Sequence, residues 1–89
     1  MLGMEHIIEL VRLIAVGVVG ERNLVGVAHE ESSDETGELT RVIVTVGGKN
    51  AGALIGVEGA TAQAIRKVVG LVGFNAIGRR VHVKIDAVR

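Results

Sequence analysis

Apolar residues recur at helical spacing near the start of the chain, with charged residues on the opposite side. The apolar residues of this stripe are Ile7, Ile8, Leu10, Val11, Ile14, Ala15 and Val18. This period predicts an amphipathic helix from Glu5 to Val19. Leu13, Val16 and Val19 lie outside the stripe, which leaves two interpretations open: they are covered within the monomer, or they form a dimer interface.

Three segments have the pattern of β-strands. Asn23–Glu30 and Glu38–Val46 are β-leaning, and the polar, acidic segment Glu31–Gly37 between them is typical of a hairpin loop. The third, Arg80–Val88, alternates strictly between apolar and polar residues, which predicts a strand with one buried and one solvated face. Its apolar positions are Val81, Val83, Ile85 and Ala87, and its polar positions are Arg80, His82, Lys84 and Asp86.

Two further helices are expected between the second and third strands. Gly47-Gly48 ends the second strand, and Asn50 is a plausible N-cap for a short helix over Ala51–Ile55. A longer helix is predicted over Ala60–Val72, with Gly73 able to end it. Its two faces are an apolar one (Ala62, Ile65, Val68, Val69, Val72) and a basic one (Gln63, Arg66, Lys67, Gly70). Residues 1–89 therefore form one α+β domain, with helices on one face of a three-stranded sheet.

The segment Gly56-Val57-Glu58-Gly59 joins these two helices and has the chemistry of a phosphate-binding turn. Two glycines allow a tight bend and the close approach of another backbone. Amide groups at the start of the next helix point outward with the positive end of its dipole, which suits a phosphate oxygen. With Arg66, Lys67 and Lys49 nearby in the sequence, the turn is a candidate site for an anionic backbone.

Composition narrows the possible functions. A chain of 89 residues supports one small domain, and its single aromatic residue, Phe74, excludes aromatic base-stacking platforms. The absence of Cys excludes disulfides and thiolate chemistry and favours the cytoplasm, and no apolar stretch is long enough for a membrane helix. Residues 1–45 carry eight acidic and three basic residues, whereas residues 46–89 carry seven basic and two acidic ones. This polarity either presents a basic face to an anionic partner or is uneven solubilising charge.

Motifs of catalytic and metal sites are missing from the sequence. Neither Lys49 nor Lys67 completes a Walker A loop, and a dinucleotide-binding loop would need a glycine at Leu54. The three histidines are far apart and show no metal-ligand spacing, and Ser32 and Ser33 lack the glycines of a nucleophile elbow. We therefore expect no catalytic residue, no metal and no cofactor.

The run from Ala53 to Val69 resembles the I-G-x-x-G signature and following helix of a KH domain. The element order is similar to the type II, bacterial form, and the resemblance to small, free-standing bacterial KH proteins of the KhpA/YlqC type covers nearly the whole chain. It implies a type II KH fold with a three-stranded mixed sheet, and binding of single-stranded RNA through the turn and a shallow apolar groove. The residues implied in RNA binding are Gly56, Val57, Glu58, Gly59, Lys49, Leu54, Ile55, Ala62, Ile65, Arg66 and Lys67.

The resemblance also implies a role in RNA metabolism or post-transcriptional regulation, and a second KH protein as a partner in a homodimer or heterodimer. Family members often carry a basic residue directly after each glycine, where this chain has Val57 and Ala60. The alternative is therefore a KH-fold protein-interaction module with little RNA affinity. A Gly56→Asp, Gly59→Asp double variant is expected to abolish RNA binding while leaving the fold intact.

Overall fold

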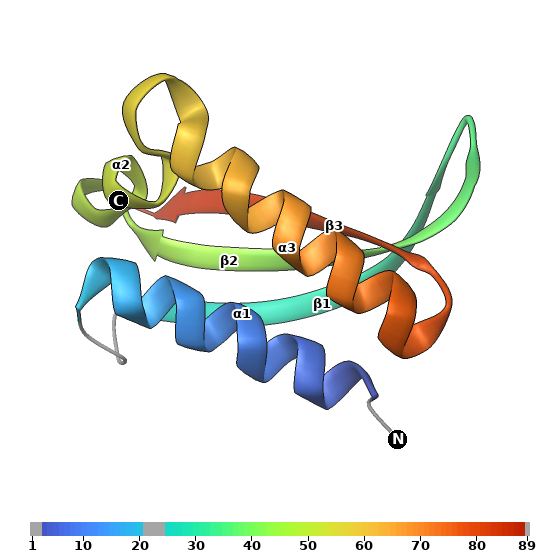
Figure 1. Ribbon diagram of the computed structural model, residues 1–89. Helices are drawn as coiled ribbons and strands as arrows, with labels where there is room; N and C mark the ends of the chain where they lie inside the picture. The colour runs from blue at the N-terminus through green and yellow to red at the C-terminus, as the bar shows by residue number, and fades with distance from the viewer. Residues whose placement is uncertain (1–2, 21–24, 89) are drawn as a thin grey trace.

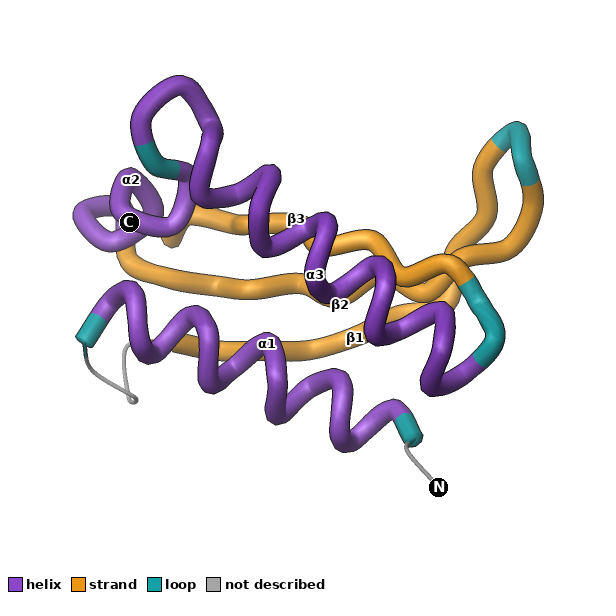
Figure 2. Tube along the Cα trace, viewed as in Figure 1, coloured by secondary structure: helices purple, strands orange, loops and turns teal. Residues whose placement is uncertain are grey.

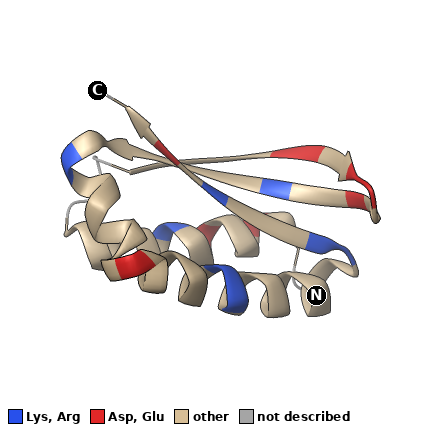
Figure 3. Ribbon diagram, turned by 90° about the horizontal axis from the view of Figure 1, so that it is seen from above, with Lys and Arg blue, Asp and Glu red and all other residues tan. Residues whose placement is uncertain are grey.

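The computed structural model describes residues 3–20 and 25–88, which form two layers. The helices are α1 (Met4–Val19), α2 (Gly48–Ile55) and α3 (Ala60–Ile77), with a 3-10 turn, η2 (Val57–Gly59), before α3. The strands are β1 (Val25–Asp34), β2 (Gly37–Gly47) and β3 (Arg80–Val88). The helices cover one face of the sheet and leave the other face free of helices (Figure 1, Figure 3). No described helix is both long and apolar enough to cross a membrane.

The sheet is mixed, with β2 in the centre between β1 and β3. β1 pairs with β2 antiparallel, whereas β2 pairs with β3 in parallel, so the chain must cross over between them. The helices α2 and α3 form this crossover (Figure 2). Val42, Val44 and Val46 of β2 are buried against the helices, which confirms the predicted central strand.

The first helix has the predicted position. Ile7, Val11 and Ala15 are buried at four-residue spacing, and the helix ends at Gly20 in the left-handed conformation (φ 93°). The sequence left open whether Val16 and Val19 are covered within the monomer or form a dimer interface. Both side chains pack against the core of the monomer. Leu13 is 71% exposed. Most of the extra apolar surface of α1 is therefore covered within one copy of the chain.

Two helix boundaries differ from the sequence-based prediction. α2 begins at Gly48 with Gly47 as its N-cap, so Asn50 lies inside the first turn and is not the cap. α3 continues through Gly73 to Ile77 and ends at Gly78, whose φ of 70° provides the left-handed C-cap. Val68, predicted to lie in the core, is 48% exposed.

Gly73 serves packing between α3 and β3, and this explains why it does not end the helix. A Cβ atom at this position would lie 2.4 Å from Val81 Cγ2 and 2.8 Å from Val81 Cβ. The absence of a side chain therefore lets the helix lie directly on the strand. The predicted helix end at Gly73 was wrong because a glycine required for close packing has the same sequence signature as a glycine that ends a helix.

The predicted seven-residue hairpin loop is also wrong. β1 continues to Asp34 and only Glu35 and Thr36 connect it to β2. The extension is held by side chains from β3: Arg80 donates to the Asp34 carboxylate at 2.8 and 3.1 Å, and to the Gly37 carbonyl oxygen at 3.0 Å. Asp34 also accepts the Thr36 backbone N–H at 2.9 Å. These bonds attach an acidic, polar segment to the sheet.

The Asp34 carboxylate gives the hairpin a pH-dependent contribution. Its hydrogen bonds from Arg80, and then from Thr36, hold the pKa of Asp34 well below its usual range. A lowered folded-state pKa contributes stability that is present above the ordinary Asp value of about 3.9 and is lost as pH falls through the lowered value. We expect Asp34→Asn to increase amide exchange at the hairpin at pH 7, and the difference from wild type to shrink below about pH 4. A difference that stays constant down to pH 2 would contradict this role.

Candidate nucleic-acid interface

The turn between α2 and α3 is built on two glycines in conformations that other residues adopt rarely. Gly56 has φ 77° and ψ 176°, and Gly59 has φ 77° and ψ 11°. The Gly59 N–H donates to the Gly56 carbonyl oxygen at 3.2 Å and closes the turn. Glu58, between them, also has a positive φ of 56°. The chain therefore reverses within four residues and presents the start of α3 to solvent.

The two glycines have different roles. A Cβ atom on Gly56 would lie 2.3 Å from Thr61 Oγ1 and 2.9 Å from the Thr61 backbone nitrogen, inside the first turn of α3. A Cβ atom on Gly59 would meet nothing within 4 Å. Gly56 is thus required by packing, whereas Gly59 borders open space. The expectation that Gly56→Asp with Gly59→Asp leaves the fold intact does not hold at Gly56, because its side chain would displace α3.

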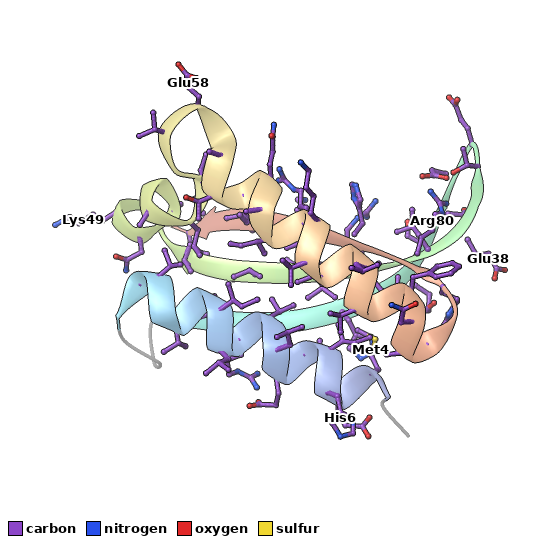
Figure 4. The ribbon with its side chains drawn as sticks, in the orientation of Figure 1. Met4, His6, Glu38, Lys49, Glu58 and Arg80 are labelled. Carbon is purple, nitrogen blue, oxygen red and sulfur yellow. The ribbon has the colours of Figure 1, made fainter. Side chains whose placement is uncertain are left out.

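The N-terminus of α3 is open at this turn. Gly59 is the N-cap of this 18-residue helix and makes no side-chain cap hydrogen bond, while the Ala60 N–H donates to the Val57 carbonyl oxygen within the turn. Its dipole therefore faces solvent at the turn. Val57 is 85% exposed, and Glu58 projects from the turn away from the molecule (Figure 4). The site can accept an anion at its backbone, but its middle residues supply no positive charge.

The predicted basic residues do not all converge on the turn. Arg66 is fixed between α3 and β3, where its Nε donates to the Val83 carbonyl oxygen at 3.2 Å. Lys67 follows it on the exposed side of the same helix. Lys49, on α2, points outward in a different direction from Glu58 (Figure 4). Arg66 and Lys67 are therefore consecutive residues of α3, and Lys49 lies on α2 and points away from the direction of Glu58.

The four apolar residues predicted to line a groove divide into two groups. Leu54, Ala62 and Ile65 are only 1%, 2% and 7% exposed, and Leu54 and Ile65 belong to the core cluster that includes β2 and β3. Ile55 is 44% exposed. In this conformation, Ile55 is the member of the set that a base can contact, while the other three support the surface from below.

A groove at the edge of β3 contains residues that the sequence interpretation missed. It has a volume of about 540 Å³ and is lined by Arg41, Arg66, His82, Val83 and Lys84. The alternation of apolar and polar residues in β3 predicts that His82 and Lys84 lie on its solvent-exposed face. The strand register then pairs His82 with Arg41 of β2, which the sequence pattern does not predict. Among the described residues, no acidic side chain lines this groove.

The opposite charges of the two halves of the chain partly cancel in three dimensions. Arg79 pairs with Glu31, and Arg80 pairs with Asp34. Two basic residues of segment 46–89 therefore neutralise two acidic residues of segment 1–45. The remaining acidic residues of the hairpin gather at that end of the sheet (Figure 3). The described residues contain no cluster of three or more His, Asp or Glu side chains arranged to hold a metal.

The element order, the mixed sheet and the glycine turn between two helices define a type II KH fold, which confirms the predicted fold class. No protein-family model and no curated protein matches the chain. Among solved structures, a variant of Era from Aquifex aeolicus bound to GDP and AlF4− is similar, with a TM-score of 0.69 and 18% identity over 92% of this chain. Era in complex with MgGDPNP and nucleotides 1506–1542 of 16S ribosomal RNA gives the same TM-score and identity over 91%. The chain covers 30% and 29% of these two Era chains.

Proposed function

We propose that this protein binds single-stranded RNA, with the backbone of the nucleic acid held at the Gly56–Gly59 turn. The observation that carries the proposal is the geometry of the turn: two glycines at positive φ bring the N-terminus of α3, which has no side-chain cap at Gly59, to the surface. Backbone amides and the helix dipole at such an end favour a phosphate group. Arg66 and Lys67, two turns further along α3, add positive charge, and Ile55 offers an apolar contact to a base.

The similarity to Era supports the proposal at the level of the fold. One of the similar Era structures contains a segment of 16S ribosomal RNA. Because the chain covers less than a third of Era, the GTP-related ligands of those structures give no reason to expect an enzyme here. We propose a binding module of the small, single-domain KhpA/YlqC type, acting in the cytoplasm in RNA metabolism or post-transcriptional regulation.

Binding to a short RNA tests this proposal. We expect a fluorescently labelled, single-stranded RNA of ten nucleotides to bind in the micromolar range at low salt and to be released as salt is raised, because phosphate contacts displace counterions. Double-stranded RNA of the same length is the control and should bind more weakly. An absence of binding even at 20 mM salt would contradict the proposal.

A second function, protein interaction, is favoured by the apolar surface of α3 and of the turn. Leu71 and Phe74, three residues apart on α3, are 67% and 56% exposed, and Val57 in the turn is 85% exposed. A homodimer, or a heterodimer with another KH protein, would cover such a surface. A mass measurement in solution distinguishes a dimer from an RNA-binding monomer. RNA binding and dimer formation are compatible if the dimer interface leaves the glycine turn exposed.

A further inference from the structure

The helix-free face of the sheet carries a cationic surface that is separate from the glycine turn. Val81 and Val83 are buried under the helices, so the alternating residues His82 and Lys84 face the other way. His82 is the register partner of Arg41 in β2, and Lys84 follows on the same face. We name Arg41, His82 and Lys84 the sheet strip.

Arg66 connects this strip to the helix that begins at the turn. Its bond to the Val83 carbonyl oxygen lies at the edge of the sheet, since β3 is an outer strand of the sheet that the described residues form. Arg66 lies seven residues after Gly59, which is about 10 Å along an α-helix. The groove lined by Arg66 and the sheet strip thus continues from the helix side of the molecule, round β3, onto the helix-free face.

The charge of this region favours an anionic occupant. Arg66 and Lys84 form no ion pair within the described part of the chain, so both charges are available to a ligand, although the Arg66 Nε is held by the Val83 carbonyl oxygen. Arg41 pairs with Glu30, its register partner in β1, at 3.0 Å, so its charge is partly neutralised although it also lines the groove with His82. Asp86, the next residue on this face of β3 after Lys84, ends the cationic region there. An extended, polyanionic chain fits a narrow region of this kind better than a compact anion does.

We infer that a single-stranded RNA held at the turn continues round the edge of β3, and that Lys84, with His82 and Arg41, contacts further phosphates on the helix-free face. This inference rests on the proposed function and extends it to a second contact point. A strand of four nucleotides occupies the turn alone, whereas a strand of ten nucleotides also reaches the strip. Affinity should therefore rise with length.

A length series with matched variants tests the inference. We expect Lys84→Ala to weaken binding of a ten-nucleotide RNA about three- to tenfold and to lower its salt slope by roughly 0.7, the value for one phosphate contact in a single strand. Binding of a four-nucleotide RNA should not change. Arg12→Ala, which removes a cation from α1, is the control and should leave both affinities unchanged. Circular dichroism verifies that both variants are folded.

The outcomes separate the two proposals. If both RNAs bind wild type equally, or if Lys84→Ala weakens the short RNA as much as the long one, the sheet strip is not a second contact point, but the turn proposal stands. If neither RNA binds wild type, both proposals fail. If a ten-residue polyglutamate displaces the long RNA as well as unlabelled RNA does, the strip accepts acidic proteins and the inference of an RNA path is overturned.

Discussion

Gly59→Asp is expected to weaken RNA binding at least tenfold, or about 1.4 kcal/mol, while the protein remains folded. The substitution places a carboxylate at the N-terminus of α3, where we propose that a phosphate lies, and like charges repel there. The backbone at Gly59 (φ 77°, ψ 11°) is left-handed, a conformation that Asp tolerates better than most residues, and a Cβ atom has free space. An RNA titration at low salt measures the loss.

Gly78→Asp is the matched control. Gly78 caps the other end of the same helix with nearly the same backbone conformation (φ 70°, ψ 18°), and a Cβ atom there also meets nothing within 4 Å. The two variants therefore carry the same added charge and similar strain. If Gly78→Asp weakens RNA binding as much as Gly59→Asp does, the effect comes from net charge or stability and the turn is not the site.

Gly73→Ala is expected to destabilise the protein by up to about 2 kcal/mol. A methyl group in an interior helical position usually stabilises by about 1 kcal/mol relative to glycine. Here it would lie 2.4 Å from Val81 Cγ2, and overpacking of this kind costs about 1–3 kcal/mol or more. For a domain of this size, the net loss lowers Tm by roughly 4–8 °C per kcal/mol, which thermal unfolding can measure.

Gly70→Ala provides the comparison, because it is the same change one turn earlier in α3. A Cβ atom at Gly70 would be 3.8 Å from the Val81 carbonyl oxygen, an ordinary contact. We expect this variant to gain about 0.5–1 kcal/mol from helix propensity. Equal Tm changes for the two variants would show that α3 does not rest on β3 at Gly73.

The parts of the fold that depend on local period were predictable from the sequence. The stripe at Ile7, Val11 and Ala15 and the alternation around Val81 and Val83 each identify an element and its buried face. The glycine turn was recognisable because its spacing and the helix behind it are contiguous in the chain. These features can be predicted without knowing which residues far apart in the chain contact one another.

The features that the sequence did not predict depend on residues far apart in the chain. The acidic end of β1 becomes strand because Arg80, 46 residues after Asp34, binds its carboxylate. Gly73 continues a helix because Val81 lies under it. The groove at the edge of β3 exists only because the strand register places Arg41 beside His82. Each of these is a tertiary contact that overrides local preference.

The central claim is that RNA binds at the glycine turn, and the most direct test is an NMR titration of the 15N-labelled protein with a ten-nucleotide single-stranded RNA. We expect the largest amide shifts at residues 56–61, with smaller shifts around Arg66 and along β3. Shifts confined to the exposed apolar side of α3 at Leu71 and Phe74, or an absence of shifts at the turn, would contradict the claim.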